Sequence, residues 1–177
     1  DGAFAKQHLR GQVKKVIVSA TSLTADSILV LGVNHLHYDP AQHQVVSYGS
    51  CTVNAYTPIA KLLHENFAIQ ESSAHITHST PLAEIKGFGT IQRRGCTLEY
   101  AGPHLLPFLK DSFYVTYRLV PYPGVSLMDM SFKFKQPASA ADVLQCLEAA
   151  ASGRLDIHIS IDKDDKDPNE YISHISS

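Results

Sequence analysis

The sequence predicts an α+β fold, with a mixed, largely antiparallel sheet that has helices packed on one face. Apolar residues recur at spacings of three and four through residues 51–67, which predicts an amphipathic helix. Strand-like stretches follow this helix at 69–80, 112–120 and 125–135. We expect these stretches to form the sheet and the helix to lie across it.

Short apolar stretches also precede the helix. Residues 13–20 come after Gly11, and their composition fits a buried strand of the parallel type. Residues 28–33 and 44–48 are predicted to be further strands, and the second of these stops at Gly49.

The predicted helix has a proline, Pro58, inside its apolar pattern. Proline fits the first turn of a helix and bends a helix elsewhere. The helix therefore begins either near Ser50, with a distortion, or at Thr57. The sequence leaves both alternatives open.

The C-terminal half contains further elements. Residues 82–110 are predicted to be loop with one short helix. A second helix is predicted over 139–151, with a serine as its N-cap and an aspartate at its third position. A last strand is predicted over 155–161, where apolar residues alternate with others. The polar stretch 162–170 is predicted to be a loop, and it lacks the Gly and Glu that a calcium loop requires.

The composition argues against several classes of function. The formal charge is −2, from 15 basic and 17 acidic residues, and the basic residues are scattered, so we expect neither nucleic acid nor a membrane as a partner. No apolar run approaches the ~20 residues of a membrane-spanning helix, and the first residues lack a secretory signal, which predicts a cytoplasmic protein. The cysteines at 51, 96 and 146 form no Cys-x-x-Cys unit, so we expect neither disulfides nor a metal site.

Cys51 and His78 are the candidate catalytic pair. Cys51 follows Ser50, a good N-cap residue, so we expect its thiol at a helix N-terminus, which together with an imidazole lowers a thiol pKa. A helix over 51–65 is ~21 Å long, and a strand that doubles back recovers this length in about six or seven residues. That strand passes the helix start near His75 and His78. His78 shares a face with apolar residues and His75 does not, so His78 is the candidate base.

The sequence Ser-Cys-Thr-Val-Asn at 50–54 resembles a known nucleophile motif, the Ser-Cys-Thr-Thr-Asn of phosphorylating glyceraldehyde-3-phosphate dehydrogenases and the related erythrose-4-phosphate dehydrogenases. Residues 58–67 are similar to the helix that follows this motif, and 14–20 and 32–35 are similar to upstream segments of the family. His78 falls where the family keeps its catalytic histidine. Residues 117–129 resemble the strand pair whose arginine binds phosphate, with one extra residue in the turn.

The resemblance implies oxidation of a sugar-phosphate aldehyde, glyceraldehyde 3-phosphate or erythrose 4-phosphate, with NAD or NADP as the hydride acceptor. It implies that Cys51 attacks the aldehyde as a thiolate and that His78 accepts the hydroxyl proton. It also allows a homo-oligomer. The substrate-binding residues that it implies are Ser50, Thr52, Arg118 and Thr80, and the residue that it implies to touch the cofactor is Ser19.

The resemblance also suggests how the chain is divided. We expect residues 1–49 to be a remnant of the edge of a nucleotide-binding domain, together with the segment that leads into the catalytic domain. We expect residues 50–177 to be the catalytic domain. No Gly-x-Gly-x-x-Gly follows a strand, and the family's Ser-Thr-Gly phosphate contact is missing from the short loop at 93–102. Two hypotheses therefore stay open: a catalytic domain of such a dehydrogenase, and a non-enzymatic relative that serves subunit or protein interaction. We expect the strand at 13–20 to be an exposed sheet edge.

Overall fold

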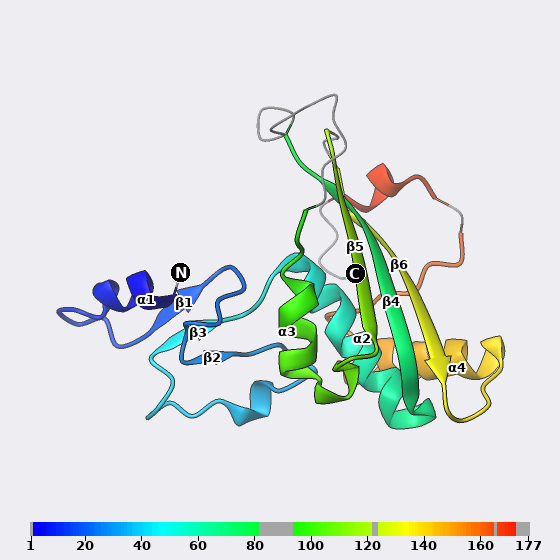
Figure 1. Ribbon diagram of the computed structural model, residues 1–177, viewed down its shortest axis with the longest axis horizontal. Helices are drawn as coiled ribbons and strands as arrows, with labels where there is room; N and C mark the ends of the chain where they lie inside the picture. The colour runs from blue at the N-terminus through cyan, green and yellow to red at the C-terminus, as the bar shows by residue number, and fades with distance from the viewer. Residues whose placement is uncertain (1, 82–93, 122–123, 165, 173–177) are drawn as a thin grey trace.

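The computed structural model of this protein describes residues 2–81, 94–121, 124–164 and 166–172. Within them, the main sheet has the strand order β5-β4-β6, with β4 (Ile69–Ser79) in the centre (Figure 1). β5 (Phe113–Val120) pairs with β4 in parallel, and β6 (Leu127–Phe134) pairs with it antiparallel. The predicted mixed sheet is confirmed, and its described pairings are one of each kind.

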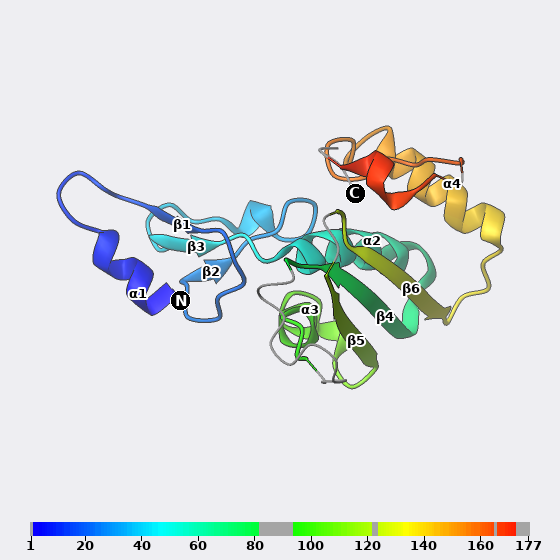
Figure 2. The ribbon, with the colours of Figure 1, turned by 90° about the horizontal axis from the view of Figure 1, so that it is seen from above.

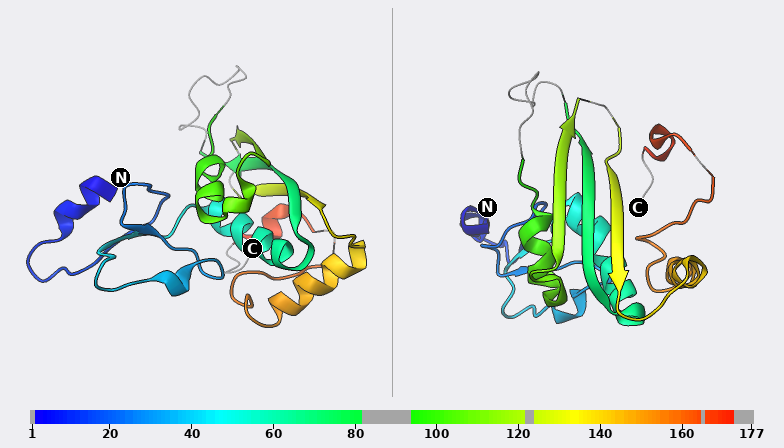
Figure 3. Two further views of the ribbon diagram at one scale, coloured as in Figure 1. Left: turned by 60° about the horizontal axis from the view of Figure 1, so that its bottom comes forward. Right: turned by 45° about the vertical axis from the view of Figure 1, so that its right-hand side comes forward.

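The helix α2 (Cys51–Phe67) packs against β4 and β6. In the right-hand view of Figure 3 it lies behind the sheet. It begins at the first of the two predicted starts, with Pro58 inside it, and Ser50 caps its N-terminus by accepting a hydrogen bond from the Val53 N–H. Four of the apolar side chains that α2 buries recur at helical spacing and belong to the core shared with the sheet: Val53, Tyr56, Ala60 and Leu63.

Two further helices flank α2. α3 (Leu98–Leu105) packs against both α2 and β5, and α4 (Ala140–Ala151) packs along α2 (Figure 2). Both were predicted from the sequence. α4 begins with the expected cap, in which Ser139 Oγ accepts a hydrogen bond from the Asp142 N–H and the Asp142 carboxylate accepts one from the Ser139 N–H.

The N-terminal segment forms a second, smaller sheet. β1 (Val16–Val18), β2 (Ser27–Ile28) and β3 (Val45–Ser47) are parallel, in the order β1-β3-β2, and each is shorter than the sequence predicts. β3 is the one described neighbour of β1, so β1 is a sheet edge as expected, and Ile17 is 72% exposed. Helix α1 (Gly2–Ala5) precedes this sheet.

One apolar core joins the two parts of the chain. It lies between α2, α3 and the main sheet, and the N-terminal segment contributes Ile28, Val30 and Val33 to it. The predicted division of the chain at residue 49 stays a prediction. Short 3₁₀ turns complete the described elements, at Lys6–His8, His35–His37, Pro107–Leu109 and Pro168–Tyr171.

The strand predicted over 155–161 is wrong. The chain there forms successive turns, in which the N–H groups three and four residues further on donate to the Leu155 carbonyl. Leu155 and Ile159 are buried against α2 and α4, whereas Ile157 is 58% exposed. The apolar residues are therefore buried at a spacing of four rather than two, because they pack on two helices instead of entering a sheet.

Gly32 allows the N-terminal segment before α2 to pack closely on the residues that follow α4. Its φ of 75° is left-handed, and a Cβ there would lie 2.5 Å from Leu155 Cδ2. Gly11 also has a positive φ, 61°, but a Cβ there meets nothing within 4 Å. We expect Gly32→Ala to lower the free energy of unfolding by about 2 kcal/mol or more, and Gly11→Ala by about 1 kcal/mol from backbone strain alone. Urea denaturation measures both losses, and equal losses would contradict this account of Gly32.

Candidate active site

Cys51 and His78 meet at the N-terminus of α2. Cys51 Sγ lies 3.4 Å from His78 Nε2, although 27 residues separate them. β4 runs back along α2 and so carries His78 to the helix start. His78 shares the helix-facing side of β4 with Ala74 and Ile76, which are both fully buried. The two side chains lie together as helix length and strand alternation predict.

His75 lies on the opposite, exposed face of β4. Its Nδ1 is 2.7 Å from Thr116 Oγ1 of the neighbouring β5. The two histidines therefore face opposite sides of the sheet, and only His78 can act on Cys51.

Three hydroxyl groups, which we call the hydroxyl cluster, gather at the same helix terminus. They belong to Ser50, Thr52 and Thr97. Ser50 Oγ lies 3.1 Å from Thr52 Oγ1 and 2.8 Å from Thr97 Oγ1. Thr97 was not predicted from the sequence, because 47 residues separate it from Ser50. Its position directly before α3 is the signal that could have indicated a hydroxyl group at a helix start.

Cys96 packs against this cluster. Its Sγ lies 3.5 Å from Thr52 Oγ1, and the side chain is 5% exposed. It lies outside any helix or strand, as expected, and behaves as a small buried side chain that holds the chain before α3 against α2.

Burial raises the pKa of the Cys51 thiol above its ordinary value, although the residue as a whole is exposed. The backbone N–H groups of Thr52 and Cys51 lower this pKa, as expected at a helix N-terminus, but loss of water around the sulfur outweighs them. The predicted lowering of the thiol pKa is therefore not found. A thiol with a raised pKa is protonated near neutral pH and needs an acceptor for its proton before it can react as a thiolate. His78 Nε2 is the ring nitrogen in contact with the sulfur.

The ring of His78 packs against Tyr117 of β5, with 5.6 Å between the ring centroids. His78 Nδ1 is buried and has no hydrogen-bond partner within the part of the chain that the structure describes. Burial raises the pKa of the Tyr117 phenol, and negative charge on either Cys96 or Cys51 would raise it further. The positive charge of Arg94 lowers it. The phenol thus lies among both thiols and Arg94.

Arg118 is not brought to this site. In the register of β4 and β5 it lies opposite Thr77, on the exposed face, whereas Leu119 lies opposite His78. Successive residues of a strand point to opposite faces, so the Arg118 side chain leaves the sheet on the side away from Cys51. The predicted role of Arg118 in substrate binding stays a prediction.

Thr80 and Ser19 occupy two different places. Thr80 follows β4, two residues beyond His78, and it is buried, with its N–H donating to the Val120 carbonyl. Ser19 is exposed and follows β1 at its carboxyl end. β3 leads from the same end of its parallel sheet into Ser50, so Ser19 lies at the sheet end from which α2 starts. The roles of Thr80 and Ser19 stay predictions.

A pocket of about 600 Å³ opens beside Cys51. Apolar side chains of α2 and β6 line much of it, and Ser160, Asp162 and Tyr171 border it. It has room for a small organic substrate next to the thiol. The polar residues that line it, apart from the helix start itself, are Ser126, Ser160, Asp162 and Tyr171.

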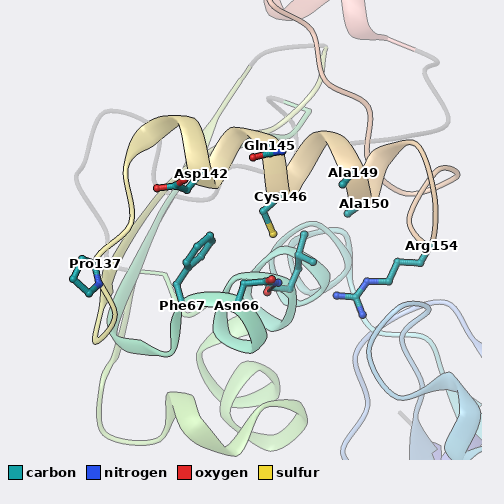
Figure 4. Close-up of a pocket in the computed structure, with 10 residues that line it drawn as sticks. Asn66, Phe67, Pro137, Asp142, Gln145, Cys146, Ala149, Ala150 and Arg154 are labelled. Carbon is teal, nitrogen blue, oxygen red and sulfur yellow. Dashed lines mark hydrogen bonds between the residues drawn. The ribbon is translucent and has the colours of Figure 1, made fainter.

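A separate groove of about 750 Å³ lies between α2 and α4 (Figure 4). The Cys146 thiol points into it from α4. Phe67, at the last residue of α2, also lines the groove, so about 25 Å of helix separates it from Cys51. Burial raises the pKa of the Cys146 thiol. Cys146 is therefore an internal reference thiol, remote from the candidate pair.

Within residues 2–81, 94–121, 124–164 and 166–172, no three side chains of His, Cys, Asp or Glu are placed to hold a metal ion together. Over the same part of the chain, every helix is too short or too polar to cross a bilayer.

No protein-family model matches the chain. It is similar to glyceraldehyde-3-phosphate dehydrogenase 2 of Caenorhabditis elegans, with 30% identity over 98% of this chain and 54% of the relative. It is also similar to the cytosolic enzyme of that name from Scenedesmus vacuolatus, with 30% identity over 96% and 59%. Glyceraldehyde-3-phosphate dehydrogenase 1 of Bacillus cereus is 35% identical over 85% and 49%. The chain spans about half the length of the curated relatives it matches. With the Cys51 motif at the start of α2 and an α+β fold around it, the chain belongs to the glyceraldehyde-3-phosphate dehydrogenase family.

Proposed function

We propose that this chain is the catalytic half of a dehydrogenase that oxidises a sugar-phosphate aldehyde, glyceraldehyde 3-phosphate or erythrose 4-phosphate, through a thiohemiacetal on Cys51. The observation that supports this most is the 3.4 Å contact between Cys51 Sγ and His78 Nε2. A thiol in contact with an imidazole is the arrangement that nucleophilic attack with a general base requires. The relatives named glyceraldehyde-3-phosphate dehydrogenase support an aldehyde as the substrate.

The addition step needs only residues of this chain. His78 Nε2 accepts the thiol proton as Cys51 Sγ attacks the carbonyl carbon. The carbonyl oxygen takes up the electron pair of the C=O bond, and the Cys51 N–H at the helix start stabilises the resulting oxyanion. His78 then gives its proton to that oxygen, which leaves a neutral thiohemiacetal. In the oxidation that follows, His78 accepts the hydroxyl proton again.

The hydroxyl cluster supports a phosphate-binding role beside the thiol. Ser50, Thr52 and Thr97 each have an O–H group to donate, and the positive end of the α2 dipole at this terminus favours an anion. A phosphate bound there is placed to release the thioester as an acyl phosphate. This role adds Thr97 to the predicted Ser50 and Thr52.

NAD or NADP is the hydride acceptor that this reaction requires. The sequence has no Gly-x-Gly-x-x-Gly, the glycine pattern with which a strand-to-helix turn binds a dinucleotide. Ser19 is the one residue predicted to touch the cofactor. The hydride step is therefore not assigned to residues of this chain.

Glyceraldehyde 3-phosphate is expected to protect Cys51 from iodoacetamide in a saturable manner, since addition of the thiol to the aldehyde needs no dinucleotide. Unphosphorylated glyceraldehyde is the matched control, and we expect about tenfold weaker protection, because it offers the hydroxyl cluster no charged acceptor. Peptide mass spectrometry reads the alkylation of each cysteine, with Cys146 as the internal reference. Equal protection by both aldehydes would contradict the phosphate site, and protection by neither would contradict the aldehyde chemistry.

A further inference from the structure

The pocket beside Cys51 has no part in the proposed function. That function uses His78 for the thiol proton and the hydroxyl cluster for the phosphate. About 600 Å³ of space opens next to the same sulfur, and of the hydroxyl cluster Thr52 alone lines it. A substrate bound to Cys51 can therefore extend into a space that the hydroxyl cluster does not border.

One wall of this pocket is a stripe of α2 that starts at the reactive sulfur. Cys51, Ala55 and Ile59 follow one another at intervals of four residues, and all three line the pocket. Side chains at this spacing lie above one another on a single helix face. The stripe from Cys51 to Ile59 is about 12 Å long. Beyond the sulfur, this wall is apolar along its whole length.

A second wall comes from the main sheet and is also apolar. Met128 and Met130 of β6 line the pocket from one face of their strand. Ile76 of β4 pairs with Met128 and lies two residues before His78, on the same face of β4. Methionine side chains are flexible and polarisable, so this wall can adapt to hydrocarbon chains of different lengths.

The charges around the pocket disfavour a phosphate group there. Among the described residues that line it, none is basic, and Asp162 is acidic. A hydrogen bond from Lys166 lowers the pKa of Asp162 to about 2, so this carboxylate is ionised near neutral pH, and Lys166 pairs with it. An anion therefore meets no unpaired cation in the lining, and sugar hydroxyl groups would lose water without partners along the α2 stripe.

We infer that this pocket binds the hydrocarbon chain of an unbranched apolar aldehyde, whose carbonyl carbon Cys51 attacks. The S–C bond forms as the electron pair of the C=O bond moves to oxygen. His78 takes the thiol proton and returns it to that oxygen, so the product is a neutral thiohemiacetal and no other reactant is needed. This inference rests on the addition step of the proposed function and extends that step to a second class of aldehydes.

A series of aldehydes of increasing chain length tests this inference. Ethanal, butanal and hexanal compete with iodoacetamide for Cys51 in the full chain, and peptide mass spectrometry reads the alkylation, with Cys146 as the internal reference. Protection is expected to be saturable, and its apparent affinity should rise by at least about tenfold from ethanal to hexanal. The reason is that each methylene group buried in an apolar pocket strengthens binding by up to about fourfold.

Three variants are compared by the ratio of the hexanal affinity to the ethanal affinity. Met130→Gln keeps the size of the side chain but places an amide in the pocket, and it is expected to lower the ratio about threefold or more. Ala55→Leu fills the pocket one helical turn from the sulfur and is expected to bring the ratio close to one. Leu144→Gln is the matched control, because Leu144 is 40% exposed on α4 and does not line the pocket, and it should keep the ratio.

The outcomes separate this inference from the proposed function. Equal protection by ethanal and hexanal would overturn the inference, and so would a ratio that Met130→Gln and Ala55→Leu both leave unchanged. Protection by glyceraldehyde 3-phosphate in the same experiment would then still support the proposed function. Protection by hexanal without protection by glyceraldehyde 3-phosphate would support the apolar pocket and contradict the sugar-phosphate substrate. Protection by no aldehyde would overturn both, because the addition step itself would be absent.

Discussion

Replacement of His78 by Asn is expected to slow the alkylation of Cys51 by about two to four orders of magnitude near neutral pH, the range that a general base contributes. Burial raises the pKa of the Cys51 thiol, so the sulfur reacts only if its proton is taken up, and His78 Nε2 is 3.4 Å away. In the variant, the thiol must lose its proton to water. Its alkylation rate should then rise only as the pH approaches the raised pKa of the thiol, whereas the unmodified chain reacts at lower pH.

His75→Asn is the matched control for this experiment. His75 is on the same strand, but it faces away from α2 and contacts Thr116 instead. We expect its replacement to leave the alkylation of Cys51 unchanged. Rates that fall equally in both variants would show that the strand, rather than the imidazole of His78, determines the reactivity of Cys51.

Replacement of Tyr56 by Ala is expected to lower the free energy of unfolding by about 3–5 kcal/mol, as loss of a large buried ring does. Tyr56 is fully buried in the middle of α2, and its ring packs 4.7 Å from that of Phe113 and 5.9 Å from that of Phe132. The side chain therefore joins the cysteine helix to both outer strands of the main sheet. Urea denaturation measures the loss, and Tyr114→Ala, at an exposed position of β5, is expected to change stability by no more than about 0.5 kcal/mol.

Tyr56→Phe separates the hydroxyl group from the ring. The Tyr56 O–H donates to Ser72 Oγ at 2.8 Å, so its removal is expected to cost about 1 kcal/mol. Burial raises the pKa of Tyr56 to about 12. The folded state thus favours the neutral phenol, and its contribution to stability is present below pH ~10 and is lost as the pH rises towards 12. Tyr56→Phe should abolish that loss, and a loss of the same size in the variant would show that another group causes it.

The fold was predicted best where local pattern and packing agree. The helix over 51–67 and the strand over 69–80 both have one continuous apolar face, and both occur within a residue of the predicted bounds. The segment 155–161 has the alternation of a strand, but it joins neither described sheet and packs on α2 and α4 instead. Hydrophobic periodicity is a local property of the sequence. It therefore does not indicate packing against elements that are far away in the sequence.

The candidate site was also predicted best where it depends on neighbouring elements of the sequence. The contact between Cys51 and His78 was predictable, because the helix and the strand are consecutive and their lengths set where they meet. The convergence of Thr97 on Ser50 was not, because 47 residues separate the two and the contact depends on how α3 packs against α2. Strand alternation from His78 places Leu119 on the helix-facing side and Arg118 on the other, and the predicted role of Arg118 in substrate binding stays a prediction.

The alkylation rate of each cysteine in the unmodified chain tests the central claim most directly. Iodoacetamide is added near neutral pH, and peptide mass spectrometry follows Cys51, Cys96 and Cys146 over time. If His78 accepts the thiol proton, Cys51 should react at least about a hundredfold faster than Cys146, since no histidine is among the described residues that line the groove of Cys146. Equal rate constants for these two thiols would mean that the sulfur and the imidazole at the head of α2 do not act as a nucleophile and its base.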